Sequence, residues 1–586
     1  MLSSRLPAIL AAGLLALAFS HQASAVRVKG EEVRAPTKSA PLTLRSSNFP
    51  NASIARLEFS QLAVERIAQV QRYNKANANF KAVKIGIGRL VDGEALQKEL
   101  PALQWQLLKS GKVTRFEVSS PDALSTRVGL RIGVLDNRAE LRFYGSGNPD
   151  KIEAVVRATD AKRLVDQNML YWTPVTEGEK QIVEIFMPLN APARDVRISV
   201  VSVMHMLVSI KDNFSLIKAF GDSDTCEVNV VCSVGTLGQN YVNAKNSVAH
   251  MVFTQSNSTF HCTGTLLNDN VAATQIPYFY SASHCINSQS LANTLVTFWN
   301  EESTVCNPSN AGSPTQLTGG ATLLYTQSGG SVGSDSGTDA TFLRLNTTPP
   351  AGAYFAGWDS SSLANSTPIT GIHHPAADVK KVSQGTKYIS HNNTQRVSWS
   401  SGTTEQGSSG SALFSYDSNG YYLRGGLFGG AASCSNSGGS AASGNSDIYS
   451  RFDVVYPNLT AWLTPAPVVG PTVSHTGPWY NPAESGWGLT WFDDYSGGNY
   501  FGLMFIYTGT GQPDWYEFAG AWTGSDIHSG NIRKNTGPAF GTTFDPAQVT
   551  KTPVGTYTLT FTSATSATLT FTIGGVTRTN IPLTKL

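Results

Sequence analysis

A glycine-rich run presents one serine as a candidate nucleophile. In the run Gly407–Ser411 (GSSGS), glycines two residues before and one residue after Ser409 permit a tight turn. Such a turn exposes the hydroxyl group and directs backbone N–H groups, here those of Gly407 and Ser409, towards a developing oxyanion. Gly/Ser runs are frequent in this chain, and Gly438-Gly439-Ser440 is interpreted as a loop, so the run alone is weak evidence.

A general base and an orienting carboxylate precede this serine in the chain. His284 follows the strand-like stretch Tyr278–Tyr280 and stands directly before Cys285, and Asp339 stands just ahead of the apolar stretch Thr341–Leu345. In a hydrolytic triad the histidine takes the proton of the serine, and a buried carboxylate holds the imidazole tautomer. The order His, Asp, Ser is that of chymotrypsin-like proteases and differs from that of subtilisins and α/β-hydrolases. Together the three residues predict a serine endopeptidase.

The elements that must position these residues have the pattern of short strands. The cysteine-bearing part of the chain is a series of short β-like runs separated by Gly/Ser/Asn loops, which is typical of a barrel or a sandwich. Ahead of it, Ile67–Tyr73 has helical periodicity, whereas Arg127–Leu135 and Glu140–Tyr144 alternate apolar and polar residues as strands do. A Pro-rich stretch that starts at Thr464 predicts a linker, and the segment after it is again strand-like.

Charge and cysteine content divide the chain into three pieces. Residues 26–218 carry 29 Lys and Arg against 20 Asp and Glu, net +9; residues 219–466 carry 8 against 14, net −6; residues 467–586 carry 5 against 7, net −2. All six cysteines fall in the middle piece. A length of 586 residues suits three or four folded units at roughly 150 residues each. We expect an α+β domain at 26–218, a β-barrel domain at 219–463, a linker at 464–473 and a β-rich module at 474–586.

The first 25 residues have the pattern of a secretory signal peptide. Arg5 precedes the apolar stretch Ala8–Phe19, and Ala23-Ser24-Ala25 provides a small-x-small pattern for cleavage after Ala25. We therefore expect a secreted, extracellular protein, in which disulfides are permitted and six cysteines favour pairing. Later in the chain no apolar run approaches the roughly 20 residues that span a bilayer, so no membrane span is expected.

The motifs of the middle piece resemble those of the bacterial lysyl endopeptidases, which are secreted trypsin-like proteases. The matching stretches are Cys226 with Cys232, Cys262-Thr263-Gly264, Ser283-His284-Cys285, Cys306, Thr338–Thr341, Ala356–Asp359, Ile372–Pro375, Gly407–Ser411 and Ser433-Cys434-Ser435. The resemblance covers residues 219–463 and implies a mostly β chain with a double β-barrel protease domain. Six cysteines alone allow fifteen pairings, and the resemblance implies the bridges Cys226–Cys434, Cys232–Cys306 and Cys262–Cys285.

The resemblance also implies a substrate preference. Thr403 stands six residues before Ser409, where animal trypsins carry the aspartate of the specificity pocket. Lysyl endopeptidases carry their pocket aspartate after the last cysteine, and the matching residue is Asp447; an ordinary loop aspartate is the alternative interpretation. A buried carboxylate selects a cationic side chain, because any other substrate leaves the charge unpaired. Lysine is preferred to arginine on the resemblance alone.

Two positions depart from the resemblance. Phe428, which with Gly429 is expected to contribute to substrate specificity, stands where well-known lysyl endopeptidases carry a histidine that stacks on a tryptophan. The segment of that tryptophan looks shortened here, around His391. The rate or pH optimum that such a stack gives need not transfer. Ser408 stands where trypsinogen-type activation requires an aspartate, so the salt-bridge switch made by a new N-terminus cannot form here.

The basic first piece is interpreted as a propeptide of the acidic protease. Lys218 lies eight residues before Cys226, at the seam, where a lysine-specific enzyme would release itself. The protease piece holds only four lysines, namely Lys245, Lys380, Lys381 and Lys387. We expect the charge contrast to help docking and the lysine contrast to direct proteolysis to the propeptide. The alternative is that secreted bacterial enzymes are simply poor in basic residues.

Other signals predict no further chemistry. Adjacent histidines in a strand, here His373 and His374, point to opposite faces, and no third ligand stands at zinc-like spacing. We therefore expect a structural role for them, no metal and no organic cofactor. A formal charge of +2 argues against a nucleic-acid partner. The last piece has five tryptophans, for which core positions are favoured over sugar-stacking surface positions: Trp479, Trp487, Trp491, Trp515 and Trp522.

The sequence therefore predicts a secreted serine endopeptidase, made as a self-processing precursor and acting as a monomer on proteins and peptides. Two alternatives stay open. One is a catalytically silent, protease-like adhesin whose last module binds the target, although an intact triad argues against it. The other is a cell-wall endopeptidase that the last module targets to its substrate.

Overall fold

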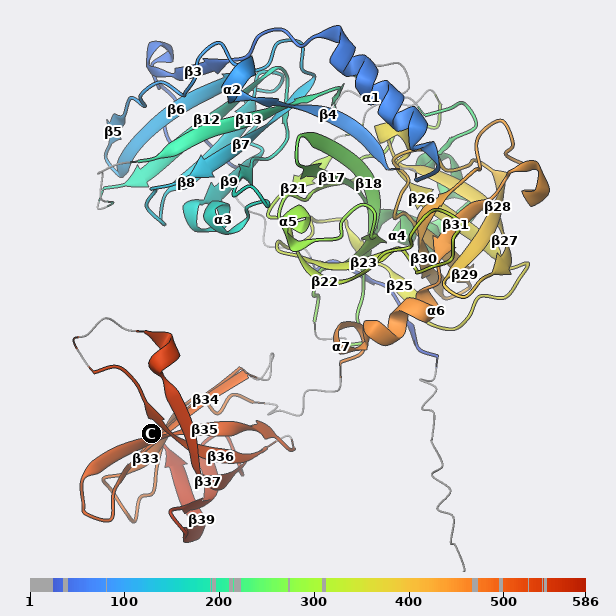
Figure 1. The fold of residues 1–586 in the computed structure, drawn as a ribbon. Helices are drawn as coiled ribbons and strands as arrows, with labels where there is room; N and C mark the ends of the chain where they lie inside the picture. Colours follow the sequence, from blue (N-terminus) through green and yellow to red (C-terminus); the bar gives the residue numbers. More distant parts are fainter. Residues whose placement is uncertain are drawn as a thin grey trace, which may run out of the picture. The chain divides into compact units, whose positions relative to one another are not determined.

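The computed structural model describes most of the 586 residues and divides them into two compact units. It describes residues 25–586 except 35–40, 81, 190, 192–195, 210–213, 216–222, 272–273, 308–311, 313, 466–472, 495–498, 525, 540 and 542–544. The first unit runs to Leu463, apart from 271–273, and the second unit contains 464–586 (Figure 1). The predicted signal peptide up to residue 24, Lys218 and most of the predicted linker lie outside the described residues.

Helices are few and short. The described ones are α1 (Val64–Ala76), α2 (Val91–Glu94), α3 (Ala158–Arg163), α4 (Val234–Asn246), α5 (Gln289–Ala292), α6 (Phe452–Val455) and α7 (Thr460–Leu463). The helical periodicity at Ile67–Tyr73 is confirmed by α1, which buries Val70 and packs Ile67 against the same apolar cluster. No helix among the described residues is long and apolar enough to cross a membrane.

The N-terminal region forms a six-stranded sheet on one side of its core. Its order is β3-β6-β12-β8-β9, with β5 at the edge of β6. The strands are β3 (Ala55–Glu58), β5 (Gln106–Leu108), β6 (Gly111–Ser119), β8 (Glu140–Gly145), β9 (Ala154–Arg157) and β12 (Lys180–Pro188). Together with α1 this sheet gives the expected α+β region.

A twelve-stranded sheet joins the N-terminal region to the first of the two barrels of the predicted protease domain. Its main path is β10-β7-β13-β4-β18-β17-β20-β21, with β11 beside β7, and β19, β23 and β22 continuing from β18. The N-terminal strands are β4 (Val83–Leu90), β7 (Ser125–Ile132), β10 (Tyr171–Trp172), β11 (Thr176–Glu177) and β13 (Ile198–Met206). The protease strands are β17 (Val248–Gln255), β18 (Ser258–Leu267), β19 (Tyr278–Ala282), β20 (Val296–Trp299), β21 (Thr315–Leu317), β22 (Ala321–Gln327) and β23 (Ala340–Leu345).

The join is the antiparallel pairing of β4 with β18. Ile87 pairs with Ser258, and Val83 pairs with His261. The first residues of β18, which pair with β17 on one side only, are thus covered on the other side by a strand of the N-terminal region, which satisfies backbone groups that would otherwise be unpaired. Beside the join, the buried Arg127 of β7 donates to the carbonyl of Thr294 at 2.6 Å. The N-terminal region and the protease therefore share one continuous sheet.

The second barrel is built on a nine-stranded sheet. Its order is β1-β25-β30-β29-β26-β27-β28-β31, with β16 beside β27. The strands are β1 (Arg27–Val28), β16 (Val228–Asn229), β25 (Gly357–Asp359), β26 (Pro368–His373), β27 (Lys381–Ser390), β28 (Thr394–Ser401), β29 (Ala412–Asp417), β30 (Gly420–Gly430) and β31 (Asp447–Ser450). Two small sheets pair β2 (Glu31–Glu32) with β24 (Tyr354–Phe355), and β14 (Val208–Ser209) with β15 (Phe214–Ser215).

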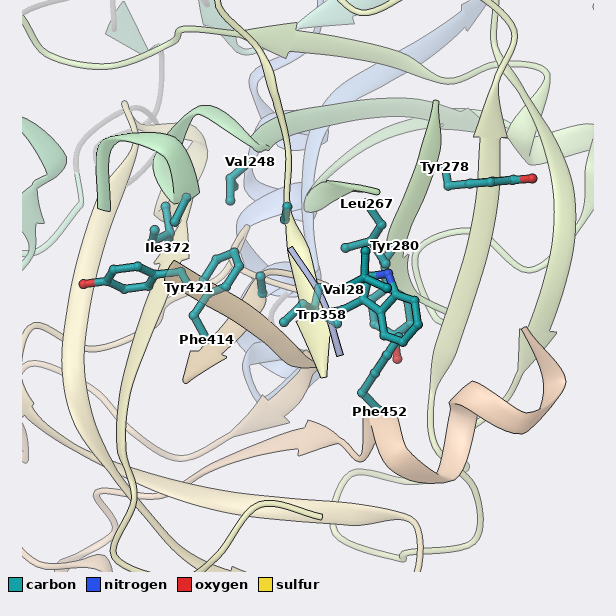
Figure 2. Packing of buried hydrophobic residues seen from close by; sticks show 14 of the residues in the cluster. Val28, Val248, Leu267, Tyr278, Tyr280, Trp358, Ile372, Phe414, Tyr421 and Phe452 are labelled. Atoms are coloured by element: carbon teal, nitrogen blue, oxygen red, sulfur yellow. The ribbon is translucent and has the colours of Figure 1, made fainter. Parts of the chain in front are cut away.

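The largest described core cluster of the protease takes residues from both barrels and from the start of the N-terminal region. Figure 2 shows Trp358, Tyr280 and Phe452 gathered beside Val28; the ring of Phe452 lies 5.7 Å from each of the other two rings. Val28 belongs to β1, which pairs with β25, and Arg27 forms an ion pair with Asp359. The residues that follow the predicted signal peptide are therefore built into the second barrel.

The second unit is a closed antiparallel barrel. Its strands are β32 (Gly477–Tyr480), β33 (Gly488–Asp494), β34 (Asn499–Tyr507), β35 (Pro513–Trp522), β36 (Ile527–Thr536), β37 (Thr550–Phe561), β38 (Ser566–Ile573) and β39 (Val576–Lys585). Alternate residues of β38, namely Ala567, Leu569 and Phe571, fill the core, as the period of two requires. The expected β-rich character of this module is confirmed.

Candidate active site

The three predicted triad residues come from both barrels and meet at one point. His284 follows β19 and Asp339 precedes β23, and these two strands pair so that Ala282 stands opposite Ala340. Ser409 lies in the turn before β29 of the second barrel, and its carbonyl accepts from the N–H of Thr263 in β18 at 2.8 Å. Strand pairing thus aligns the histidine with the carboxylate, and the barrel-to-barrel contact supplies the serine.

A chain of hydrogen bonds connects the three side chains. His284 Nδ1 lies 2.6 Å from Asp339 Oδ2, and His284 Nε2 lies 2.8 Å from Ser409 Oγ. The backbone N–H of His284 also donates to Asp339 Oδ1, at 2.9 Å. Both carboxylate oxygens are therefore used to orient the histidine. With Nδ1 as the donor, Nε2 can accept the serine proton. The single hydrogen of the Ser409 hydroxyl has a second acceptor in this structure, the backbone carbonyl oxygen of Phe80 at 2.5 Å.

Asp339 is placed under strain and out of water. Its backbone φ is +51°, in the left-handed region that residues other than glycine rarely adopt. Burial raises the pKa of this carboxyl, and the interaction with His284 works against that rise. Strained backbone at a buried titratable group is a common property of functional sites.

Two glycines make the turn around Ser409. Gly407 has φ +100° and Gly410 has φ +79°. A Cβ atom at Gly407 would lie 2.7 Å from the carbonyl oxygen of His374, and one at Gly410 would lie 2.1 Å from Ser281 Oγ. Both the conformation and the close approach exclude a side chain, so the glycines of the run are required by the turn that presents Ser409.

Asp447 is buried at the first position of β31. Its Oδ2 accepts from Trp399 Nε1 at 2.7 Å and from Thr404 Oγ1 at 2.6 Å. Gly430, which pairs with Asp447, leaves space for the other oxygen, because a Cβ there would lie 2.3 Å from Oδ1. Thr404 immediately follows Thr403, the position at which trypsins carry their pocket aspartate. A buried, oriented carboxylate therefore lies close in space to that position, although it is far from it in the sequence.

The N-terminal region occupies the surface in front of the triad. The backbone carbonyl of Phe80, in the 3₁₀ turn Ala78–Phe80, accepts from Ser409 Oγ at 2.5 Å. The Phe80 ring lies 5.7 Å from the ring of His284 and 6.2 Å from that of Phe428. A Cβ at Gly429 would lie 2.1 Å from the carbonyl oxygen of Asn79. As a result, Ser409 is 0% exposed.

Phe428 and Gly429, which were predicted to contribute to substrate specificity, thus both lie against the N-terminal region. Phe428 is buried, and its ring lies 6.2 Å from that of His284. The aromatic ring therefore contacts the candidate base directly. The contact of Asn79 with Gly429 requires that this position stay free of a side chain.

Ser408 is held by a histidine and not by a new N-terminus. Its Oγ lies 2.8 Å from His373 Nδ1, and His373 Nε2 lies 3.0 Å from Ser383 Oγ. His373 and His374 have different surroundings, as expected for neighbours in a strand: His374 Nδ1 lies 3.2 Å from the carbonyl oxygen of Asp378. These contacts agree with the structural role that was predicted for His373, because they hold the turn that carries Ser409.

The six cysteines form three disulfides in the pairing that the family resemblance implies: Cys226–Cys434, Cys232–Cys306 and Cys262–Cys285. The last of these ties β18 to the residue that follows His284. Among the processing residues, Ala25 is described and exposed, whereas Lys218 lies outside the described residues.

The tryptophans of the last module divide between core and surface. Trp479, Trp491 and Trp522 are buried in the barrel core, Trp487 packs partly against it, and Trp515 is 42% exposed. The core interpretation is thus correct for three of the five. Phe505 of β34, which pairs with Trp515, is also exposed, so one face of the barrel presents aromatic side chains.

The comparisons with known proteins agree with this geometry. A model of the lysyl endopeptidase N-terminal domain matches residues 58–207, and a model of the lysyl endopeptidase C-terminal domain matches residues 220–450. A curated lysyl endopeptidase of Pseudomonas aeruginosa is 35% identical over 436 residues, covering 71% of this chain and 89% of that protein. The chain belongs to the lysyl endopeptidase family. It is a serine endopeptidase of mostly β structure.

Solved structures with some likeness are also serine proteases or protease domains. A thermostable serine protease from an extremophilic microorganism is 14% identical and covers 38% of this chain and 99% of its own, with a TM-score of 0.27. The active form of a protease from M. tuberculosis is 13% identical, and the match covers 43% of this chain and 92% of that protease, with a TM-score of 0.26. At these TM-scores the likeness adds no argument about the family member described here.

Sequence reasoning missed residues that support the site from other elements. Trp399, on β28, and Thr404 orient Asp447; only Thr404 had a signal, its place next to Thr403. Phe80 had no signal, because a backbone carbonyl leaves no trace in the residue type. Its position depends on the pairing of β4 with β18, which brings the two regions together.

Proposed function

We propose that this family member is a secreted endopeptidase that hydrolyses peptide bonds after lysine by a triad of Ser409, His284 and Asp339. The observation that carries the proposal is the continuous hydrogen-bond chain from Asp339 through His284 to Ser409. The disulfides and the family membership are consistent with secretion.

In the proposed reaction, Ser409 Oγ attacks the scissile carbonyl carbon while His284 Nε2 takes its proton. The carbonyl oxygen becomes an oxyanion, to which the backbone N–H groups of Gly407 and Ser409 donate. His284 then gives its proton to the leaving amine, and a water molecule, deprotonated by His284, hydrolyses the acyl-enzyme. Asp339 stabilises the imidazolium and keeps Nδ1 as the donor.

The preference for lysine is assigned to Asp447. A buried carboxylate with one oxygen already held by Trp399 and Thr404 would pair with an ammonium group at the end of a long side chain. A neutral side chain would desolvate that carboxylate without compensating it. The name of the matching relative, lysyl endopeptidase, supports the same preference.

The N-terminal region is assigned the role of a propeptide that blocks the enzyme until it is cut. Phe80 covers Ser409, so a substrate carbonyl has no access to the nucleophile while this turn stays docked, and self-processing requires its transient release or an enzyme molecule that is already free. The net charges of +9 on residues 26–218 and −6 on residues 219–466 favour docking before cleavage. Cleavage after Lys218 would separate the two parts at the seam between the two family domains.

Self-processing can be tested on the full-length precursor. Purified precursor should convert with time to a chain that begins near Ala219, as read by mass spectrometry, and the Ser409→Ala precursor should stay intact. Ser440→Ala, in the loop Gly438-Gly439-Ser440, is the matched control and should process like the unaltered chain. Processing of the Ser409→Ala precursor at the same rate in a protease-free preparation would refute the proposal.

A further inference from the structure

Buried metal-binding side chains that the catalytic proposal does not use gather beneath the turn of Ser409. His250 lies on β17, Glu301 follows β20, and His374 follows β26. One potential ligand atom from each of these three residues lies within 4.8 Å of the other two. All three side chains are buried, with residue exposures of 0%, 2% and 0%. His261, also buried, has its ring 3.8 Å from that of His250.

The surroundings of two of the rings fix their tautomers. His374 Nδ1 lies 3.2 Å from the carbonyl oxygen of Asp378, and His261 Nε2 lies 3.2 Å from the carbonyl oxygen of Gly407. A carbonyl oxygen only accepts, so each of these nitrogens carries the hydrogen. The other nitrogen of each ring, His374 Nε2 and His261 Nδ1, is then a lone pair in the protein interior. Neither has a hydrogen-bond partner among the described residues.

The remaining two members, His250 and Glu301, share one hydrogen in a hydrogen bond, and a metal ion that binds both would have to displace this hydrogen. His250 Nδ1 lies 2.6 Å from Glu301 Oε2, and His250 Nε2 also lacks a hydrogen-bond partner in the described part of the chain. Neutral imidazoles whose second nitrogen donates to a backbone carbonyl have the arrangement of metal-ligating histidines.

We propose that His250, Glu301 and His374 bind a structural Zn²⁺ ion between the two barrels of the protease. Imidazole nitrogen and carboxylate oxygen are ligands that zinc accepts in proteins, and His261 offers a further nitrogen beside the set. A buried lone pair without a donor is unfavourable, and a cation would satisfy several at once. The sequence did not predict this site, because His250 and Glu301 lie far from His374 in the chain and do not show the short spacing that is typical of zinc ligands.

The position of the site gives the ion a structural purpose. His250 and Glu301 belong to the first barrel, and His374 belongs to the second. The carbonyl of Gly407, in the turn that carries Ser409, contacts His261 Nε2 and accepts from Thr263 Oγ1 at 3.0 Å. An ion at this place would tie the two barrels together directly under the proposed oxyanion turn, without taking part in the reaction.

The test uses the full-length Ser409→Ala chain, which the proposed self-processing leaves intact, and does not depend on activity. The zinc content of protein produced with Zn²⁺ is measured by mass spectrometry of the metal, and about one ion per chain is expected. Protein unfolded with a chelator and refolded without metal should melt several degrees lower, and added Zn²⁺ should restore the melting temperature.

Two variants locate the ion. Glu301→Gln and His374→Gln should each lose most of the bound zinc, whereas His391→Gln, a histidine of the same domain outside the cluster, should keep it. If His374→Gln fails to fold, two measurements still test the proposal. One is the zinc content of the isosteric Glu301→Gln variant, and the other is a zinc titration of the protein in which these residues are unaltered. Protein with no bound zinc and no zinc-dependent melting overturns the proposal, as does full zinc retention in Glu301→Gln.

Discussion

Asp447 is the residue on which the proposed selectivity depends. Replacing it by Asn keeps the shape but removes the charge that would pair with a lysine ammonium. We expect kcat/KM for lysyl peptides to fall by roughly 10²- to 10³-fold, the loss typical of one partner in a buried ion pair. Labelling of Ser409 by a small neutral phosphonylating reagent should change little, because the triad is untouched. The exposed carboxylate Asp417, changed to Asn, is the control.

An Asp447→Asn enzyme that still cleaves lysyl peptides at the full rate would contradict the assignment. Equal loss of peptide cleavage and of labelling would also do so, because it would place the defect in the triad or in folding and not in selection of the substrate side chain.

The residue types were sufficient to predict the triad, but they were not sufficient to predict the residues that contact and orient the site. Ser409, His284 and Asp339 each stand in a short local motif, and their order along the chain restricts the fold class. Trp399 and Phe80 act through an indole N–H and a backbone carbonyl, which many positions offer equally. Such contacts are set by strand register between distant segments, so a single sequence does not disclose them.

At the scale of elements, the 3₁₀ turn that ends at Phe80 contacts Ser409 and is the proposed barrier to the nucleophile. The change Phe80→Ala removes ring contacts with His284 and Phe428, each worth about 1 kcal/mol. In a precursor that carries Lys218→Gln to keep the N-terminal region attached, we expect Ser409 to be labelled roughly 30-fold faster after this change, which corresponds to about 2 kcal/mol. Leu107→Ala, an exposed position on β5 of the N-terminal region, should leave the labelling rate unaltered. An unchanged rate in Phe80→Ala would argue against a block at this position.

Strand β13 carries a buried histidine that makes the N-terminal region sensitive to acid. Burial lowers the pKa of His205 to about 4, and the nearby Arg89 adds to the effect. Between the ordinary value of 6.5 and about 4, the unfolded chain holds a proton that the folded chain lacks. The free energy of unfolding should therefore fall as the pH falls through this range, by roughly 2–3 kcal/mol.

Denaturant unfolding of the Ser409→Ala precursor at pH 7 and pH 4.5 measures this loss. The His205→Asn chain has no titrating group at position 205. It should therefore lose correspondingly less stability between pH 7 and pH 4.5. The same pH dependence in both chains would show that other groups cause it.

For the whole molecule, the division into two units predicts that catalysis does not need the last module. Every residue assigned to the site lies in the first unit, and the barrel β32–β39 has its own core. An enzyme that ends at Thr464 should hydrolyse small lysyl peptides with kcat/KM within about twofold of the complete chain. A large loss on such peptides would mean that the module contributes to the site itself.

The sequence predicted the architecture of the three pieces better than their connection. Composition, cysteine position and the Pro-rich stretch at Thr464 separated the protease from the last barrel. The pairing of β4 with β18 and the insertion of Val28 into the second barrel were not predicted, because such pairing is long-range and leaves no local periodicity. The boundary expected between residues 218 and 219 therefore separates two segments of the chain that share one continuous sheet in the precursor.

The most direct test of the account is a map of cleavage sites. Processed enzyme and protein carrying Ser409→Ala are incubated with a peptide library, and the cut positions are identified by mass spectrometry. We predict cleavage after lysine by the enzyme and a loss on the order of 10⁶-fold in kcat for Ser409→Ala. Cleavage that ignores lysine would contradict the role of Asp447. Equal cleavage by the Ser409→Ala protein, or none by the correctly processed enzyme, would contradict the triad.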